Sequence, residues 1–234
     1  MHSEVTKGNK NTGKIRNVLL AAPSYDGKVS VWHATSLAET CKLGLSRGIN
    51  IVPVYVSYDA LVQRARNDIF RIAVESGVDD LFFVDCDIDW NPEDFFRLLA
   101  YDVDIIGAPV IKKNDIEQYS IKTSLPLEKE ENGLVSVESV ATGFMRIRRD
   151  ALLRIWENCT EVYQETQHKT QSKMIFQIKV IGGSLYSEDV NFCLEWRYGG
   201  GKIYIDPVIN CGHEGNKRWV GNFSGWVNKL VTDK

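Results

Sequence analysis

The sequence predicts an α/β fold in which helices flank a mostly parallel sheet. Apolar runs of strand length alternate with helical segments through residues 17–109. Alternation at this spacing implies right-handed crossovers between parallel strands. The run at 81–84 is continuously apolar and ends abruptly in acids, which is typical of a strand buried on both faces.

Cap residues and glycines set the helix limits in the first half. Ser30 and Asp59 supply cap oxygens at two helix starts, and Asn91 precedes a first-position proline at a third. The elements expected there are strands at 17–23, 49–56, 81–85 and 103–109 and helices at 30–48, 59–77 and 92–101. The apolar residues of the first helix favour one face as its buried face: Val31, Ala34, Leu37, Ala38, Cys41 and Leu45.

The second half changes character. Residues 112–140 are polar and rich in turn formers, which predicts a hairpin or a flexible loop over the site. Three glycines at 199–201 follow a helical pattern and are typical of a helix end rather than a phosphate loop. The elements expected here are strands at 142–148, 174–181 and 202–205, helices at 150–158, 187–198 and 219–231, and a loop at 161–173.

Composition indicates an ordinary globular protein of 234 residues with one large domain. A net charge of −3 argues against a general nucleic-acid or acidic-membrane surface. Five cysteines without a C-x-x-C pair favour a reducing compartment, so we expect a cytoplasmic location, in a host cytoplasm if the protein is viral. Residues 1–14 are polar and lack a signal-peptide core, which predicts a disordered tail, and no membrane span is expected.

Alternating carboxylates follow the third strand. Asp85 and Asp87 would reach the carboxyl edge of the sheet, where open α/β folds place ligands. Neighbouring carboxylates on a stiff backbone repel one another unless a cation lies between them, which predicts a metal–diphosphate site. Helix capping is the alternative, but Asn91 already fills the cap position. An EF-hand is excluded because Trp90 stands where that loop needs glycine.

With these elements placed, the chain resembles the GT-A glycosyltransferases over residues 17–215. Those enzymes move a sugar from a nucleotide diphosphate to an acceptor. The features that carry the resemblance, in chain order, are Arg66-Asn67, the D-x-D pair Asp85 and Asp87, the turn Thr142-Gly143-Phe144, Ser187-Glu188-Asp189 at a helix start, and His213. The resemblance implies a GT-A, Rossmann-like sheet with a smaller mixed region on the acceptor side.

A nucleotide-sugar donor is expected at the end of the first strand. The turn there could hold a nucleoside, with Tyr25 stacking on the base, although these residues also favour a plain turn. Arg66 suits a diphosphate because its charge is fixed and its donors are forked; an ordinary ion pair is its alternative. The donor-binding residues expected are Pro23, Ser24, Tyr25, Asp26, Arg66, Asn67, Asp85 and Lys217.

The metal ligands expected are Asp87, Asp85 and His213. Asp87 would be the principal ligand, and Asp85 would bond the ribose or a water on the metal. Mn²⁺ fits better than Mg²⁺ because it tolerates mixed oxygen and nitrogen ligands. An ordinary loop histidine is the alternative for His213, which lies between Gly212 and Glu214 in a glycine-flanked segment.

A catalytic base would take the proton from the acceptor hydroxyl. Asp189 matches the family position, and Glu188 would orient or contact the acceptor. The first turn of a helix favours ionised carboxylates, as a base requires, but acids there are also common capping residues. A base on this face implies inversion at the anomeric carbon.

These observations predict a metal-dependent glycosyltransferase that moves a sugar from a UDP-sugar to a carbohydrate or glycoprotein hydroxyl. Residues 15–234 would form one domain, with a donor half at 15–110 and an acceptor half at 111–234. The anchorless form is similar to viral enzymes that build capsid glycans, or to bacterial ones. Two alternatives stay open: a phosphoaspartyl phosphatase, which Asp89 disfavours, and a non-catalytic sugar-nucleotide-binding module. The sugar and the acceptor are not defined by the sequence.

Overall fold

A computed structural model describes residues 15–123, 127–164 and 169–232. The tail predicted at 1–14 lies outside these described residues. Within those ranges no helix is long and apolar enough to cross a membrane. The helices are α1 (Val31–Ser46), α2 (Val62–Ser76), α3 (Pro92–Ala100), α4 (Arg149–Asn158), α5 (Glu188–Tyr198) and α6 (Phe223–Thr232).

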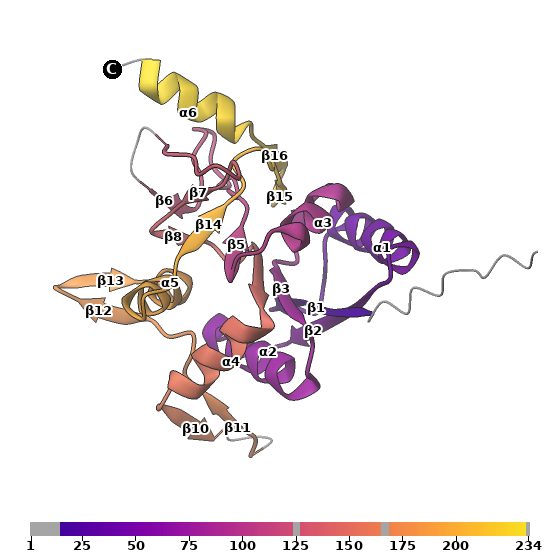
Figure 1. Cartoon of the computed structure of the whole chain (residues 1–234), viewed down its shortest axis with the longest axis vertical. Coiled ribbons are helices and arrows are strands. Elements are labelled where there is room, and N and C mark those ends of the chain that lie inside the picture. The colour runs from indigo at the N-terminus through magenta and orange to yellow at the C-terminus, as the bar shows by residue number, and fades with distance from the viewer. Residues whose placement is uncertain (1–14, 124–126, 165–168, 233–234) are drawn as a thin grey trace, which may run out of the picture.

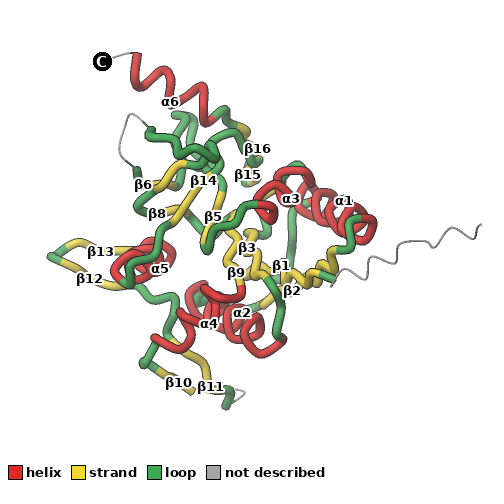
Figure 2. Tube along the Cα trace, viewed as in Figure 1, coloured by secondary structure: helices red, strands yellow, loops and turns green. Residues whose placement is uncertain are grey.

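A seven-stranded mixed sheet forms the centre of the molecule, with the strand order β2-β1-β3-β9-β5-β14-β7. Helices flank it, so the expected α/β class is confirmed and a Rossmann-like arrangement is consistent with it (Figure 2). Its strands are β1 (Arg16–Ser24), β2 (Ile49–Ser57), β3 (Asp80–Val84), β5 (Ile105–Gly107), β7 (Val135–Ser136), β9 (Phe144–Arg148) and β14 (Ile203–Ile205).

The expectation of a mostly parallel sheet is wrong. Strand β9 lies between β3 and β5 and runs antiparallel to both. The chain leaves β5 at the carboxyl edge of the sheet and returns at that same edge, where Phe144 pairs with Val84. A strand that re-enters at this edge must run in the opposite direction to its neighbours. Strand β7 is also antiparallel to its neighbour, β14.

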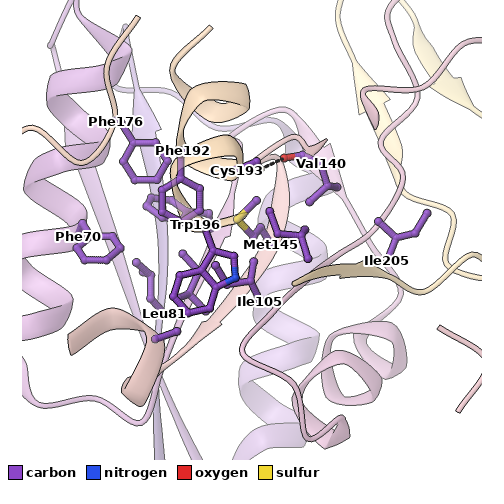
Figure 3. Close-up of a cluster of buried hydrophobic side chains, with 14 of the residues drawn as sticks. Phe70, Leu81, Ile105, Val140, Met145, Phe176, Phe192, Cys193, Trp196 and Ile205 are labelled. Atoms are coloured by element: carbon purple, nitrogen blue, oxygen red, sulfur yellow. Dashed lines mark hydrogen bonds between the residues drawn. The ribbon is translucent and has the colours of Figure 1, made fainter. Parts of the chain in front are cut away.

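Alternate residues of the central strands fill two hydrophobic layers. Leu19 and Ala21 of β1 pack with α2, α4 and α5, whereas Val18 and Leu20 pack with the layer under α1 and α3. Figure 1 shows α1 beside α3 on one flank and α2 beside α4 on another. Figure 3 shows the first layer, where Phe176 and Phe192 stack with ring centroids 4.6 Å apart. This packing fixes the sheet edge that carries the acids.

The buried face of α1 differs from the apolar face predicted for it. Val31 and Leu45 are 77% and 76% exposed. The buried residues are His33, Ser36, Thr40 and Gly44. The three polar side chains are tolerated inside because each has a hydrogen-bond partner there, and Gly44 lets α1 approach β2 closely.

Other boundaries also differ from the predictions. Helix α2 begins at Val62 rather than at Asp59. The Asp59 carboxylate instead accepts from the Leu61 amide in the preceding turn and pairs with Arg64 in the first turn of the helix. The loop predicted at 161–173 contains strands in its described part, and the strand predicted at 174–181 is reduced to three residues. The short strands outside the main sheet are β4 (Ile88–Asp89), β6 (Ile121–Lys122), β8 (Ser139–Val140), β10 (Val162–Gln164), β11 (Gln171–Lys173), β12 (Lys179–Ile181), β13 (Ser184–Tyr186), β15 (Gly212–Glu214) and β16 (Arg218–Val220).

Candidate functional site

The acidic loop, residues 85–87, begins where β3 ends. The Asp85 amide donates to the Gly143 carbonyl at 3.2 Å, which joins the loop to the start of β9. A tight turn follows, in which the Ile88 amide donates to the Asp85 carbonyl at 3.0 Å. The buried strand therefore delivers these carboxylates to the carboxyl edge, as the sequence predicts.

A buried histidine supports the acidic loop from α1. His33 Nδ1 lies 3.1 Å from the Asp85 carbonyl and 3.2 Å from the Ile88 carbonyl. Because carbonyl oxygens only accept, Nδ1 carries the proton, and Nε2 accepts from the Tyr55 hydroxyl at 2.9 Å. Burial lowers the pKa of His33, which favours this neutral form. Sequence reasoning missed this residue, which lies outside the apolar face predicted to be buried.

His213 reaches the acidic loop through backbone pairing. Strand β15 pairs antiparallel with β4, so His213 lies opposite Ile88, and the Glu214 amide donates to the Asp87 carbonyl at 2.8 Å. His213 Nδ1 lies 2.7 Å from the Ile111 carbonyl and therefore carries a proton. Nε2 then faces Asp87 Oδ1 at 3.6 Å. The Ile111 carbonyl thus fixes the orientation of the ring, as backbone carbonyls do for many metal-binding histidines.

Asp87 is surrounded by basic groups. Its Oδ2 accepts from Lys113 Nζ, and its Oδ1 faces His213. Burial acts to raise the pKa of Asp87, but the nearby basic side chains of His213 and Lys113 outweigh it and lower the pKa to about 2. The carboxylate is therefore ionised at neutral pH. Lys113 carries no local sequence signal; it lies in the polar stretch predicted to cover the site.

A buried arginine joins two acids. Arg66 donates through Nη1 to Glu188 Oε1 and through Nη2 to Asp85 Oδ1, the latter at 3.2 Å. The side chains of Arg66 and Glu188 are only 8% and 10% exposed. Burial raises the pKa of Glu188, and the positive charge of Arg66 opposes that rise. The structure thus brings the predicted Arg66, Asp85 and Glu188 together.

A cavity of about 550 Å³ lies in front of the acidic loop. Tyr25 is 74% exposed at this cavity, and Asp26 pairs there with Lys28 at 2.9 Å. The predicted site residues that line the cavity are Pro23, Ser24, Tyr25, Asp26, Arg66, Asp85, Asp87 and His213.

Three predicted residues are engaged elsewhere. Both ends of the Asn67 amide bond the backbone of Phe176, at 3.1 and 2.7 Å, so this side chain anchors a loop instead of facing the cavity. Lys217 pairs with Asp115. The Asp189 carboxylate accepts from the Ser187 hydroxyl and from the Val190 amide, which are helix-start contacts.

Within the part of the chain that the structure describes, no three His, Cys, Asp or Glu side chains lie close enough to hold a metal ion by themselves. Asp87 and His213 offer one carboxylate oxygen and one imidazole nitrogen at the same point. That mixed donor pair suits Mn²⁺ better than Mg²⁺, because Mn²⁺ tolerates a nitrogen ligand beside oxygen ligands. Divalent ions held by few protein ligands take their other ligands from water and substrate phosphates. The residues present therefore fit a metal that is completed by its substrate.

Comparison with known proteins bears on the fold. A scan against protein-family models found no matching family, and a search of curated proteins found no similar sequence. The chain is similar to the crystal structure of A197 from STIV, with a TM-score of 0.54 and 15% identity over 89% of this chain and 91% of that one. At this identity the likeness shows a shared fold alone.

A second similar structure is that of a glycosyltransferase involved in the glycosylation of the major capsid of PBCV-1. The TM-score is 0.36 and the identity 14%, over 60% of this chain and 65% of that one. A TM-score this low does not establish a shared fold.

Proposed function

We propose that this protein is a metal-dependent glycosyltransferase that moves a sugar from a nucleotide-diphosphate donor, a UDP-sugar, to a hydroxyl of a carbohydrate or glycoprotein acceptor. The observation that carries the proposal is the meeting of Asp87 and His213 beside the cavity. They come from segments far apart in the chain and are brought together by the pairing of β4 with β15.

The donor would lie in the cavity of about 550 Å³, with its nucleoside against Tyr25 and Asp26 at the end of β1. Exposed aromatic rings suit stacking on a base, and a nearby carboxylate can accept from its amino or imino groups. Asp85 would bond the ribose. Asp87 and His213 would hold Mn²⁺ or Mg²⁺, which neutralises the departing diphosphate when bound.

The contacts favour Glu188 over Asp189 as the base. Glu188 shares Arg66 with Asp85, whereas the Asp189 carboxylate is bonded at the helix start. Burial raises the pKa of Glu188, although the charge of Arg66 opposes this, and a raised pKa makes a carboxylate a stronger base. Glu188 would take the proton from the acceptor hydroxyl while Arg66 holds its other side. A carboxylate that acts as a base on the acceptor would imply inversion at the anomeric carbon.

Release of UDP from UDP-sugars, with and without an added glycan, tests the proposal. We expect turnover with Mn²⁺ that is lost on chelation and in Asp87→Asn and His213→Ala. Asp102→Asn is the matched control, because that side chain is 92% exposed and pairs with Arg148. Metal-independent turnover would count against the proposed role of Asp87 and His213.

The same protein preparation separates the remaining possibilities. Glu188→Gln should lose about 10²–10⁴-fold in turnover, the range for a general base, while Asp189→Asn should lose stability more than turnover. The reverse ranking would restore Asp189 as the base. UDP binding without turnover of any UDP-sugar would indicate a binding module, and trapping by beryllofluoride would indicate a phosphatase.

A further inference from the structure

We propose that Lys113 is an internal counterion of the metal site. Its ammonium pairs with Asp87 until a divalent cation displaces the ammonium, and the displaced ammonium then binds the diphosphate that arrives with the cation. This inference rests on the proposed function. It makes metal and nucleotide binding mutually dependent.

Lys113 occupies the oxygen of Asp87 that His213 leaves open. Its ammonium donates to Oδ2, while His213 Nε2 faces Oδ1 at 3.6 Å. A divalent cation bound to this carboxylate would lie within a few ångströms of the ammonium, and the two like charges would repel each other. The cation and the Lys113 ammonium therefore compete for one carboxylate.

The backbone that carries Lys113 is tied to the candidate metal ligand. The Ile111 carbonyl accepts from His213 Nδ1 at 2.7 Å, and the Lys112 amide donates to the Gln118 carbonyl at 2.8 Å. Ile111 also forms an antiparallel bridge with Tyr119, which closes the loop at its base. Because the loop is held at this end, displacement needs a movement of the side chain rather than of the backbone.

The stem of Lys113 runs over a glycine. A Cβ built on Gly215 would lie 3.1 Å from Lys113 Cδ, and Gly215 itself lines the donor cavity. The side chain of Lys113 is 35% exposed, so its four-carbon stem has open space on the solvent side. A displaced ammonium stays within reach of the same cavity, where an ammonium is a good point charge for phosphate.

Two consequences follow for binding. Without nucleotide, the metal must displace an ammonium that gains no new partner, so metal affinity is low. With a nucleoside diphosphate present, the displaced ammonium gains a phosphate, so each ligand increases the affinity for the other by the same factor. A simple two-ligand site without Lys113 lacks this penalty.

The test measures Mn²⁺ binding by calorimetry and by electron paramagnetic resonance, with and without UDP, and requires no turnover. Lys113→Met should bind Mn²⁺ about tenfold more tightly without UDP, equal to about 1.4 kcal/mol, and should show a correspondingly smaller gain on adding UDP. Lys113→Arg, which keeps the charge, should resemble the wild type. Lys112→Met is the matched control, with the same charge change one residue away on the same loop, and should leave Mn²⁺ binding unaltered.

Three results would overturn the inference, and they are distinguishable. If wild type binds Mn²⁺ with UDP but Lys113→Met binds it no more tightly without UDP, the counterion role fails and the proposed function stands. If Lys113→Met instead loses affinity for UDP when a chelator is present, then Lys113 binds the diphosphate in place of a metal and is not displaced by one. If wild type binds no Mn²⁺ even with UDP, the metal-dependent function fails together with the inference. Thermal unfolding of each variant, followed by circular dichroism, checks that all are folded.

Discussion

Replacing Arg66 by methionine measures how much the Arg66 guanidinium stabilises the protein by pairing with Glu188 and Asp85. The substitution keeps a long apolar stem but leaves Glu188 and Asp85 without their shared cation. Because the Arg66 and Glu188 side chains are only 8% and 10% exposed, solvent screens them little. Removing one partner of a buried pair costs about 3–5 kcal/mol. In a domain of this size that loss lowers the unfolding temperature by roughly 10 °C.

The loss should depend on pH in a defined direction. Burial already raises the pKa of Glu188 above its ordinary value of 4.5, and removal of Arg66 should raise it further. A carboxyl with a raised folded-state pKa stabilises the protein below its unfolded pKa, and this stability is lost as pH rises through the folded value. The deficit of Arg66→Met should therefore be largest near pH 7.5 and shrink toward pH 5.

Urea unfolding followed by tryptophan fluorescence at both pH values measures this. Adding Glu188→Gln to Arg66→Met should recover much of the stability at pH 7.5, because the uncompensated buried charge is removed. Arg71→Met on the same helix is the matched control. Its close partner Glu75 is 59% exposed and Asp68 lies farther away at 3.9 Å, so a loss of about 1 kcal/mol is expected. A loss at Arg66 no larger than at Arg71, with no pH dependence, would refute the reasoning.

Three further perturbations test the supports of the acidic loop. Gly212→Ala would place a Cβ 1.9 Å from Asp89 Oδ2, so the Asp89–Arg218 ion pair must shift. Urea unfolding should show a loss of stability of about 1–3 kcal/mol. An unchanged unfolding midpoint would contradict this. His33→Leu removes the hydrogen-bond donor to the Asp85 and Ile88 carbonyls and should lower the stability of the protein by about 1–3 kcal/mol. It should also weaken Mn²⁺ binding in the presence of UDP. Unaltered metal affinity would argue against the view that His33 positions the acidic loop. Burial acts to raise the pKa of Asp87, but the neighbouring His213 and Lys113 lower it to about 2. Wild type should therefore lose stability as pH falls from about 4 to 2. The side chain is 40% exposed, which reduces the expected loss to about 1 kcal/mol, and Asp87→Asn should show a flatter acid titration of stability than wild type.

The parts of the fold that the sequence predicts are those governed by local pattern. The apolar run before Asp85 specifies a strand buried on both faces, and the strand end then specifies where the carboxylates lie. The direction of β9 has no such signal, because it depends on the edge at which the chain re-enters the sheet. Periodicity was also misleading for α1, where hydrogen-bonding partners make a polar face the buried one.

The candidate site likewise contains residues that local sequence patterns predict and residues that they do not. The sequence predicts the positions of Asp87, Arg66 and the end of β1 beside one cavity, because each follows from an element boundary or a short motif. Their roles there stay predictions. Lys113 and His33 were not predicted, since their roles arise from contacts between segments that are distant in the sequence. Asn67 shows the converse. It matches a motif, but its side-chain amide bonds the backbone of Phe176 and the sulfur of Met174 and does not face the cavity.

The central place of β9 means that the chain is not divisible at residue 110. Without Phe144–Arg148, β3 and β5 have no common neighbour, and the apolar rows at Leu81 and Phe83 lose a partner strand. A nascent chain that has emerged only as far as β5 therefore has an incomplete sheet. The pairing of β3 and β5 with β9 can form only after the later residues are synthesised. For the same reason, a chimaera made by exchanging the C-terminal half would remove a core strand, so exchanges of sequence are better confined to the surface loops.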